Sequence, residues 1–333
     1  MGDLVMATPA FGAIRARFPK AEIAVMVRRG LTELVEGAPW CDRIVAGHGR
    51  SEGLISLVRA VVRVRRGKYD LAVLFPNSFR SALVARLGRC ARVAGYDRDG
   101  RGWLLTERVT PTMEGGRFVP VPTIGYYLEL AGRVGAQTGD GRMELFVEER
   151  DRALAEKALR EAGLAGKRPL VVMSPGASYG PSKCWPVERF AHTAELLAEK
   201  TGAGVGILCG PGELEQGKRI VELAECEVRI VGEGKLDLGT VKGVIERADV
   251  VITNDTGSRH IAAALGRAVV TIFGPTDPTW AEISYERERV VRVDVECGPC
   301  QAPVCTKDHR CMTRIEPERV AEEAMELMKP AGG

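Results

Sequence analysis

The sequence has few aromatic residues and no long apolar run. Aromatic side chains make up 5% of its 333 residues, and no basic stretch alternates with them. Sites for single-stranded nucleic acid stack bases on aromatic rings, so we expect no nucleic-acid partner. No run reaches the roughly 18 apolar residues of a membrane-spanning helix. The first residues also lack the basic and apolar segments of a secretion signal. We therefore expect a cytoplasmic protein.

The cysteines support this expectation. The chain has nine, an odd number, so they cannot all pair with one another. Five of them are scattered through segments that look like core elements, where a free thiol behaves as a small hydrophobic group. Such use of cysteine is typical of a reducing compartment.

Charge is distributed unevenly along the chain. The net charge is only +3, yet residues 1–150 carry 23 Lys and Arg against 16 Asp and Glu. A basic first half suggests a phosphorylated substrate or an anionic lipid surface as partner. The amphipathic segment 54–68 ends in a basic cluster and could touch the inner face of the cytoplasmic membrane. An equally good interpretation is a core-packed helix with basic residues at its C-terminal end.

Both halves alternate apolar strands with amphipathic helices. In the first half we predict strands at 22–27, 69–75 and 91–96, with helices near 8–18, 51–66, 78–88 and 122–135. In the second half we predict strands near 169–173, 204–209, 228–232, 249–253 and 268–273, with helices near 187–200, 213–225, 239–247, 258–266 and 316–329. This pattern predicts an α/β protein with two doubly wound, Rossmann-like domains, at 1–155 and 156–333, facing a cleft.

No first strand is predicted for the first domain, because the chain enters a helix at Thr8 with no apolar strand before it. In a doubly wound domain that strand is central. We favour a start codon further upstream over a domain that lacks the strand.

One segment points to a binding site. Val250–Thr253 predicts a buried strand, Asn254–Gly257 a sharp turn, and the residues from Ser258 a helix. Open α/β sheets bind ligands at such a turn, and a helix N-terminus favours a phosphate. Asp255 beside a phosphate suggests that the ligand also has sugar hydroxyls. A nucleotide sugar supplies both the phosphate and the sugar hydroxyls.

Three segments together resemble glycosyltransferase family nine, the ADP-heptose:lipopolysaccharide heptosyltransferases. They are Gly2–Ala10, Ser174–Pro186 and Asn254–Pro278. The resemblance implies the GT-B fold, an ADP-heptose donor bound by the second domain, an acceptor bound by the first, inversion, and no cofactor or metal in catalysis. Pro76–Leu83 is more similar to the members that add the second heptose, to heptosyl-Kdo2-lipid A of the lipopolysaccharide inner core, than to those that add the first.

Asp3 matches the catalytic base proposed for this family. An acceptor hydroxyl is a poor nucleophile unless a carboxylate takes its proton. Lys183 matches the phosphate-binding lysine, which would stabilise the charge that builds on the departing diphosphate. Ser178, in a loop of small residues, would donate to the same group.

Further donor contacts follow from the turns after two strands. Glu213 is expected to accept hydrogen bonds from the ribose hydroxyls, with Glu215 as the alternative. The remaining donor-binding candidates are Asp255 for sugar hydroxyls, the N–H groups of Thr256 and Gly257 for phosphate, and His260 for the diphosphate.

Asn77, Arg80 and Arg101 follow expected strand ends in the first half. The family's acceptor carries anionic groups, so these residues are candidates for acceptor binding, although each arginine could equally be an ordinary surface residue.

A separate cluster comprises Cys297, Cys300, Cys305 and Cys311. Four thiolates with a Cys-x-x-Cys pair could hold a structural zinc ion. An iron–sulfur cluster, two disulfides and free thiols are the alternatives.

Other functions fit the sequence less well. A sugar-nucleotide epimerase shares the fold, but the family-nine motifs argue against it. An NAD-dependent oxidoreductase is disfavoured because no Gly-x-Gly-x-x-Gly follows an early strand. A heptosyltransferase I-like or other family-nine transferase, and a non-catalytic nucleotide-sugar-binding protein, remain alternatives.

Overall fold

The computed structural model describes residues 1–47 and 53–329. The chain divides into two compact units. The first unit comprises residues 1–5, 144–278 and 284 onward, and the second comprises residues 6–143 and 279–283. The expected boundary at 155 falls inside a helix, Glu149–Glu161, that belongs to the first unit.

The first unit is built on one parallel sheet. Its strands are β8 (Leu170–Ser174), β9 (Gly204–Ile207), β10 (Val228–Ile230), β11 (Val250–Asn254), β12 (Ala268–Ile272) and β13 (Glu288–Val291). They lie in the order β10-β9-β8-β11-β12-β13, and every pair is parallel. Every residue of β8, β11 and β12 is buried. A sheet covered on both faces requires such continuous apolar strands.

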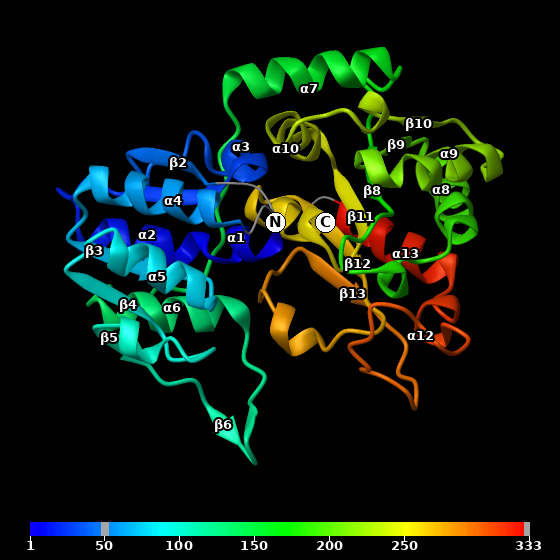
Figure 1. Cartoon of the computed structure of the whole chain (residues 1–333). Helices are drawn as coiled ribbons and strands as arrows, with labels where there is room; N and C mark the ends of the chain where they lie inside the picture. Colours follow the sequence, from blue (N-terminus) through cyan, green and yellow to red (C-terminus); the bar gives the residue numbers. More distant parts are fainter. Residues whose placement is uncertain (48–52, 330–333) are drawn as a thin grey trace. The chain divides into compact units, whose positions relative to one another are not determined.

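The helices of this unit are α7 (Glu149–Glu161), α8 (Val187–Thr201), α9 (Leu214–Leu223), α10 (Leu238–Arg247), α11 (Gly257–Ala264), α12 (Arg310–Thr313) and α13 (Pro317–Met328), with short 3₁₀ turns η3 (Pro181–Lys183), η4 (Pro211–Glu213) and η5 (Gly232–Gly234). These helices pack on the sheet or, as α7 does on α10, on one another. Apolar residues of α8 and α13 pack with alternate residues of the central strands in one core. Figure 1 shows these two helices beside the sheet.

The strand order reverses between β8 and β11. From β8 the chain moves outward through β9 and β10, then returns to the other side of β8 as β11. The C-terminal ends of β8 and β11 are therefore neighbours at a topological switch point, where open α/β sheets bind ligands. The fold thus places Ser174 and Asn254 at the expected site.

The second unit contains two separate parallel sheets. One pairs β1 (Ala24–Arg28) with β2 (Arg43–Gly47), and the other has the order β3 (Leu71–Leu74), β4 (Arg92–Tyr96), β5 (Glu107–Val109). Its other elements are α2 (Thr8–Arg17), η1 (Arg29–Leu31), α3 (Thr32–Val35), α4 (Leu54–Gly67), α5 (Phe79–Leu87), η2 (Gly102–Leu104), the hairpin β6 (Met113–Glu114) with β7 (Arg117–Phe118), α6 (Thr123–Arg133) and most of η6 (Pro278–Ala281).

No strand of the described residues joins β1 to β3. This division is what a doubly wound domain would have without its central strand. Ahead of α2, residues Gly2–Met6 form a short helix, α1, which carries Asp3 in its first turn. Most of α1, residues 2–5, belongs to the first unit, whereas the sequence placed it in the N-terminal domain.

None of the helices in the described residues is long and apolar enough to cross a membrane.

Candidate active site

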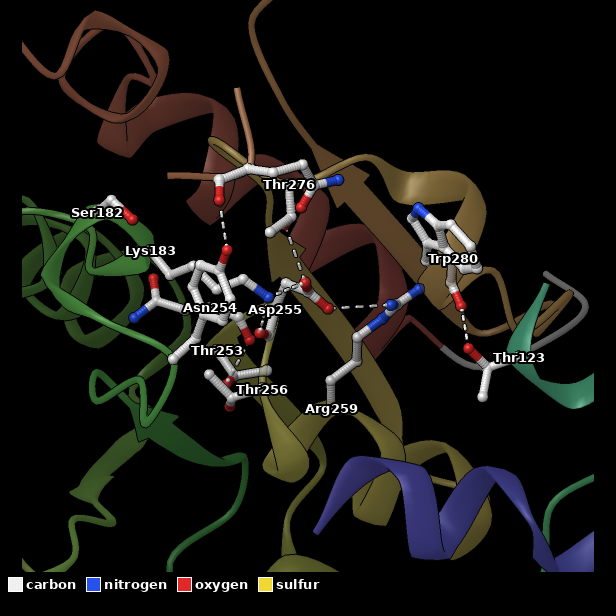
Figure 2. Close-up of polar contacts among 12 residues, drawn as sticks. Thr123, Ser182, Lys183, Thr253, Asn254, Asp255, Thr256, Arg259, Thr276 and Trp280 are labelled. Atoms are coloured by element: carbon white, nitrogen blue, oxygen red, sulfur yellow. Dashed lines mark hydrogen bonds and ion pairs between the residues drawn. The ribbon is translucent and has the colours of Figure 1, made fainter. Parts of the chain in front are cut away.

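Asp255 is the centre of a buried polar cluster at the end of β11. Its side chain is largely buried, and its Oδ2 lies 2.5 Å from Lys183 Nζ and accepts a hydrogen bond from Thr276 Oγ1 at 3.1 Å. Its Oδ1 lies 3.3 Å from Nη1 of Arg259, one helical turn along α11. Figure 2 shows these three side chains around the carboxylate. Asp255 therefore organises the cluster, and a sugar hydroxyl would have to share its oxygens.

The charges around Asp255 keep it ionised. Burial alone would raise its pKa, but the positive charges of Lys183 and Arg259 outweigh burial and lower it. An opposite charge at hydrogen-bond distance favours the charged form of a carboxyl group. Asp255 is thus an anion that holds a lysine ammonium in place.

Arg259 has a second partner that the sequence did not reveal. Its Nε and Nη2 donate to the two carboxylate oxygens of Glu288, at 2.6 Å and 2.9 Å. Thr271 Oγ1 also donates to Glu288, at 2.6 Å. Both charged side chains are almost fully buried. The pair fixes the arginine that faces Asp255.

Lys183 ends η3, within a loop held by Asn254. The fully buried Asn254 amide donates to the carbonyl of Pro175 at 2.6 Å, and its oxygen accepts from Trp185 N at 3.1 Å. The Lys183 ammonium donates to the Asp255 carbonyl at 3.1 Å as well as to its carboxylate. Because an ammonium has three N–H groups, a third can reach a ligand. Asn254 lay in the predicted motif but was not identified as a site residue.

Glu213 lies on the same side of the sheet. It ends η4, after β9, and accepts a hydrogen bond from Gly210 N at 2.8 Å. A Cβ atom on Gly176 would lie 1.9 Å from its carboxylate, so Glu213 packs directly on the loop after β8. Glu215 instead forms an exposed ion pair with Lys218. This placement favours Glu213 over Glu215 as the ribose ligand.

The predicted phosphate donors begin α11. Thr256, Gly257 and Ser258 are partly buried, and Ser258 Oγ lies 2.9 Å from Ser174 Oγ at the end of β8. The α11 N-terminus thus faces the loop after β8. Ser178, also predicted to bind phosphate, is exposed in that loop.

His260 is buried beneath α1. Its Nδ1 has no hydrogen-bond partner among the described residues. A Cβ atom on Gly2 would lie 2.8 Å from the imidazole ring, so Gly2 packs directly on it. Burial, and next the charge of Arg259, lower the pKa of His260 to about 3. The imidazole is therefore neutral near pH 7.

Asp3 follows the glycine that packs on His260. It is exposed in the first turn of α1, and so open to a substrate. The structure thus places this predicted base and the donor-binding candidates in one compact unit.

The acceptor candidates lie together in the second unit, but Arg101 is fully buried. Its guanidinium donates to the carbonyls of Tyr96 and Ser78 and to the Asn77 side chain, at 3.0, 3.2 and 3.3 Å. We therefore correct the prediction that Arg101 binds the acceptor: it braces the loop after β3. Asn77 also accepts from Tyr126, and the half-buried Arg80 donates to Ser56.

All nine cysteines are free. Cys297, Cys300, Cys305 and Cys311 line a common pocket in the first unit.

Comparison with known proteins identifies the family. The family model described as "Glycosyltransferase family 9 (heptosyltransferase)" matches residues 57–310. The chain is 27% identical to lipopolysaccharide heptosyltransferase 2 of Salmonella typhimurium over 345 residues, covering 100% of this chain and 97% of that protein.

Two solved structures share the fold of this chain. A family 9 glycosyl transferase from Veillonella parvula has a TM-score of 0.83 at 20% identity and covers 98% and 94% of the two chains. The E. coli ADP-heptose lps heptosyltransferase II has a TM-score of 0.78 at 25% identity and covers 98% and 95%. These likenesses confirm the predicted GT-B fold. The chain belongs to glycosyltransferase family 9, the heptosyltransferases.

Proposed function

We propose that this protein is an inverting glycosyltransferase that moves heptose from ADP-heptose to the inner core of lipopolysaccharide. The full-length likeness to proteins named heptosyltransferase 2 supports this function and favours addition of the second heptose. One structural observation supports it most: Lys183 and the N-terminus of α11 lie together at the switch point of the sheet. Lysine and helix N-termini both stabilise a diphosphate.

The donor side would hold ADP through groups already in place. Lys183 and the N–H groups at the start of α11 would face the two phosphates. Glu213, on the loop after β9, would accept hydrogen bonds from the ribose hydroxyls. Negative charge grows on the diphosphate as it leaves, so a fixed ammonium there stabilises the transition state more than the ground state.

Asp3 would activate the acceptor. Its carboxylate takes the proton of the acceptor hydroxyl while that oxygen bonds to the anomeric carbon of heptose. The bond from this carbon to the phosphate oxygen breaks, and its electrons leave with ADP. A single displacement inverts the anomeric carbon. The neutral His260 lies beneath the adjacent glycine and would support α1 without exchanging a proton.

The test is ADP release, measured with and without heptosyl-Kdo2-lipid A. We expect release only when both donor and acceptor are present. Asp3→Asn should lower turnover by about 10²–10⁴-fold and leave ADP affinity unchanged. Asp294→Asn, at a carboxylate with 85% exposure, is the matched control and should behave as the parent protein.

An enzyme that acts without acceptor, such as an epimerase, would convert the donor in both arms. A pure binding protein would release no ADP in either. Turnover of Asp3→Asn within a few-fold of the parent would rule out Asp3 as the base.

We also propose that α4 touches an anionic lipid surface, such as the inner face of the cytoplasmic membrane. Leu54, Ile55, Val58 and Val62 of this helix are exposed although they are apolar. Arg59 and Arg66 are exposed among them. Apolar residues that insert and arginines that meet phosphates are typical of interfacial helices.

Sedimentation with lipid vesicles tests this surface. The protein should bind vesicles that contain phosphatidylglycerol and not purely zwitterionic ones. Exchanging Arg59 and Arg66 for Gln should release it, whereas Arg219→Gln on α9 should not. Equal binding to both vesicle types would rule out the proposed charge recognition.

A further inference from the structure

The connection between β13 and α12 brings four thiols to one pocket. Cys297, Cys300 and Cys305 lie in this connection, which has no helix or strand, and Cys311 lies in the first turn of α12. All four line the pocket, together with Ser182 and His309. Its volume of about 20 Å³ is enough for one water-sized occupant. Residues distant along the loop thus share one small space.

The surroundings of the thiols favour a cation. Lys307 N donates to Cys305 Sγ at 3.4 Å, and such backbone donors support a thiolate. Four thiolates gathered in one small pocket would repel one another unless a positive ion lay between them. Within residues 1–47 and 53–329, however, no three His, Cys, Asp or Glu side chains already form a metal-binding group.

We propose that Cys297, Cys300, Cys305 and Cys311 bind one Zn²⁺ as a structural site. Four thiolates satisfy the tetrahedral preference of zinc, and a Cys-x-x-Cys pair forms half of many such sites. The four side chains line one pocket but do not yet surround a single metal position. Zinc binding must therefore move the connection between β13 and α12 toward the pocket. That step releases the thiol protons and contributes to folding.

The same connection holds the loop of Lys183. Ser182 makes three hydrogen bonds to it: Ser182 Oγ donates to the Ala302 carbonyl at 2.6 Å, and Ser182 N donates to the Pro303 carbonyl at 3.2 Å. The Ser182 carbonyl lies 2.7 Å from His309 Nε2, which must donate because a carbonyl only accepts. A metal that closes the connection therefore also fixes the residue before Lys183. The expected effect of the metal on ADP binding rests on the proposed role of Lys183 in binding the donor.

Metal content and cobalt spectroscopy test the site. The full chain, produced without a histidine tag in zinc-supplemented medium, should carry about one zinc per chain. After removal of zinc, added Co²⁺ should give the visible and thiolate charge-transfer bands of a tetrahedral sulfur site. Cys300→Ser should weaken metal binding by at least tenfold. Cys226→Ser, outside the pocket, is the matched control and should bind as the parent protein.

Three results would overturn the site. They are no metal with four reactive thiols, disulfides among the four cysteines, and undiminished cobalt bands in Cys300→Ser. None of these measurements depends on sugar transfer, so failure of the proposed function would leave them unaffected. Iron in place of zinc would contradict the assigned ion.

Calorimetry with ADP tests the coupling. Removal of zinc should weaken ADP binding several-fold, and restoring zinc should recover it. Gly180→Ala offers an independent variant, because a Cβ there would lie 2.3 Å from the Pro303 carbonyl. It should keep the metal and lose ADP affinity. If ADP affinity is unchanged in both the zinc-free protein and Gly180→Ala, the metal site does not influence ADP binding. Metal content and cobalt spectroscopy would still decide whether the site exists.

Discussion

Glu288 gives the most quantitative prediction. Replacing it with Gln keeps its shape but removes one of the two carboxylates that face Arg259, the other being that of Asp255. The side chains of Arg259 and Glu288 are 3% and 7% exposed. Removing one partner of such a buried pair leaves an uncompensated charge, which costs about 3–5 kcal/mol. Because Gln retains one acceptor for Arg259 and Thr271, we expect a loss of about 3 kcal/mol in the free energy of unfolding.

The first unit contains a matched control. Arg152 Nε and Nη2 donate to the two carboxylate oxygens of Glu246, at 2.9 and 3.0 Å, with the same two-pronged geometry. These side chains are 47% and 23% exposed. Water screens such a pair, so Glu246→Gln should cost less than about 1 kcal/mol. The two ion pairs thus share the same hydrogen-bond geometry and differ in how deeply they are buried.

Hydrogen exchange read by mass spectrometry measures both variants within the first unit. The slowest amides of β11 report its opening, and their exchange rates convert to free energies. We expect Glu288→Gln to accelerate them about a hundredfold or more and Glu246→Gln by less than tenfold. Equal effects would refute the argument, because burial would then not decide the contribution of the pair.

Two further predictions concern the proposed site. Glu213→Ala should weaken ADP binding, measured by calorimetry, by about tenfold or more through loss of charge-assisted hydrogen bonds, while Glu215→Ala should leave it unchanged; the reverse result would exchange the two assignments. The pKa of His260 is lowered from 6.5 to about 3 in the folded protein, so below pH 6.5 the unfolded chain takes up a proton that the folded chain does not. From pH 7 to pH 5 the parent should therefore lose about 2 kcal/mol of stability more than His260→Asn, and parallel urea-denaturation series for the two proteins would contradict this.

Most of the fold of the first unit could be predicted from the sequence, because its central strands are continuous apolar runs. β8, β11 and β12 lie within a residue or two of the predicted strands. β13 was missed because it begins with Glu288 and Arg289 and lacks an apolar pattern. Its Glu288 is buried only because Arg259, distant in sequence, neutralises it. Periodicity cannot reveal such a long-range pair.

For a similar reason, the sequence predicted individual residues of the candidate site but not the contacts among them. Motif positions indicated Lys183, Glu213 and Asp255, whose placement by the sheet follows from strand ends. Their mutual contacts do not follow from any motif. Arg101 was predicted to bind the acceptor because it follows an expected strand end and the family's acceptor carries anionic groups. Only the tertiary structure shows the loop that it supports.

The glycines at positions 2 and 257 allow the first residues of the chain to pack closely on the first unit. Gly2 leaves room for the His260 ring, and a Cβ on Gly257 would lie 2.5 Å from the Met1 sulfur. The chain passes to the other unit only after Val5. Asp3 is thus anchored to the same body as Lys183. In the proposed function, the base and the groups that bind the diphosphate therefore belong to one compact unit, which sets the distance between them. Only the acceptor must then bind next to this unit for the reaction to proceed.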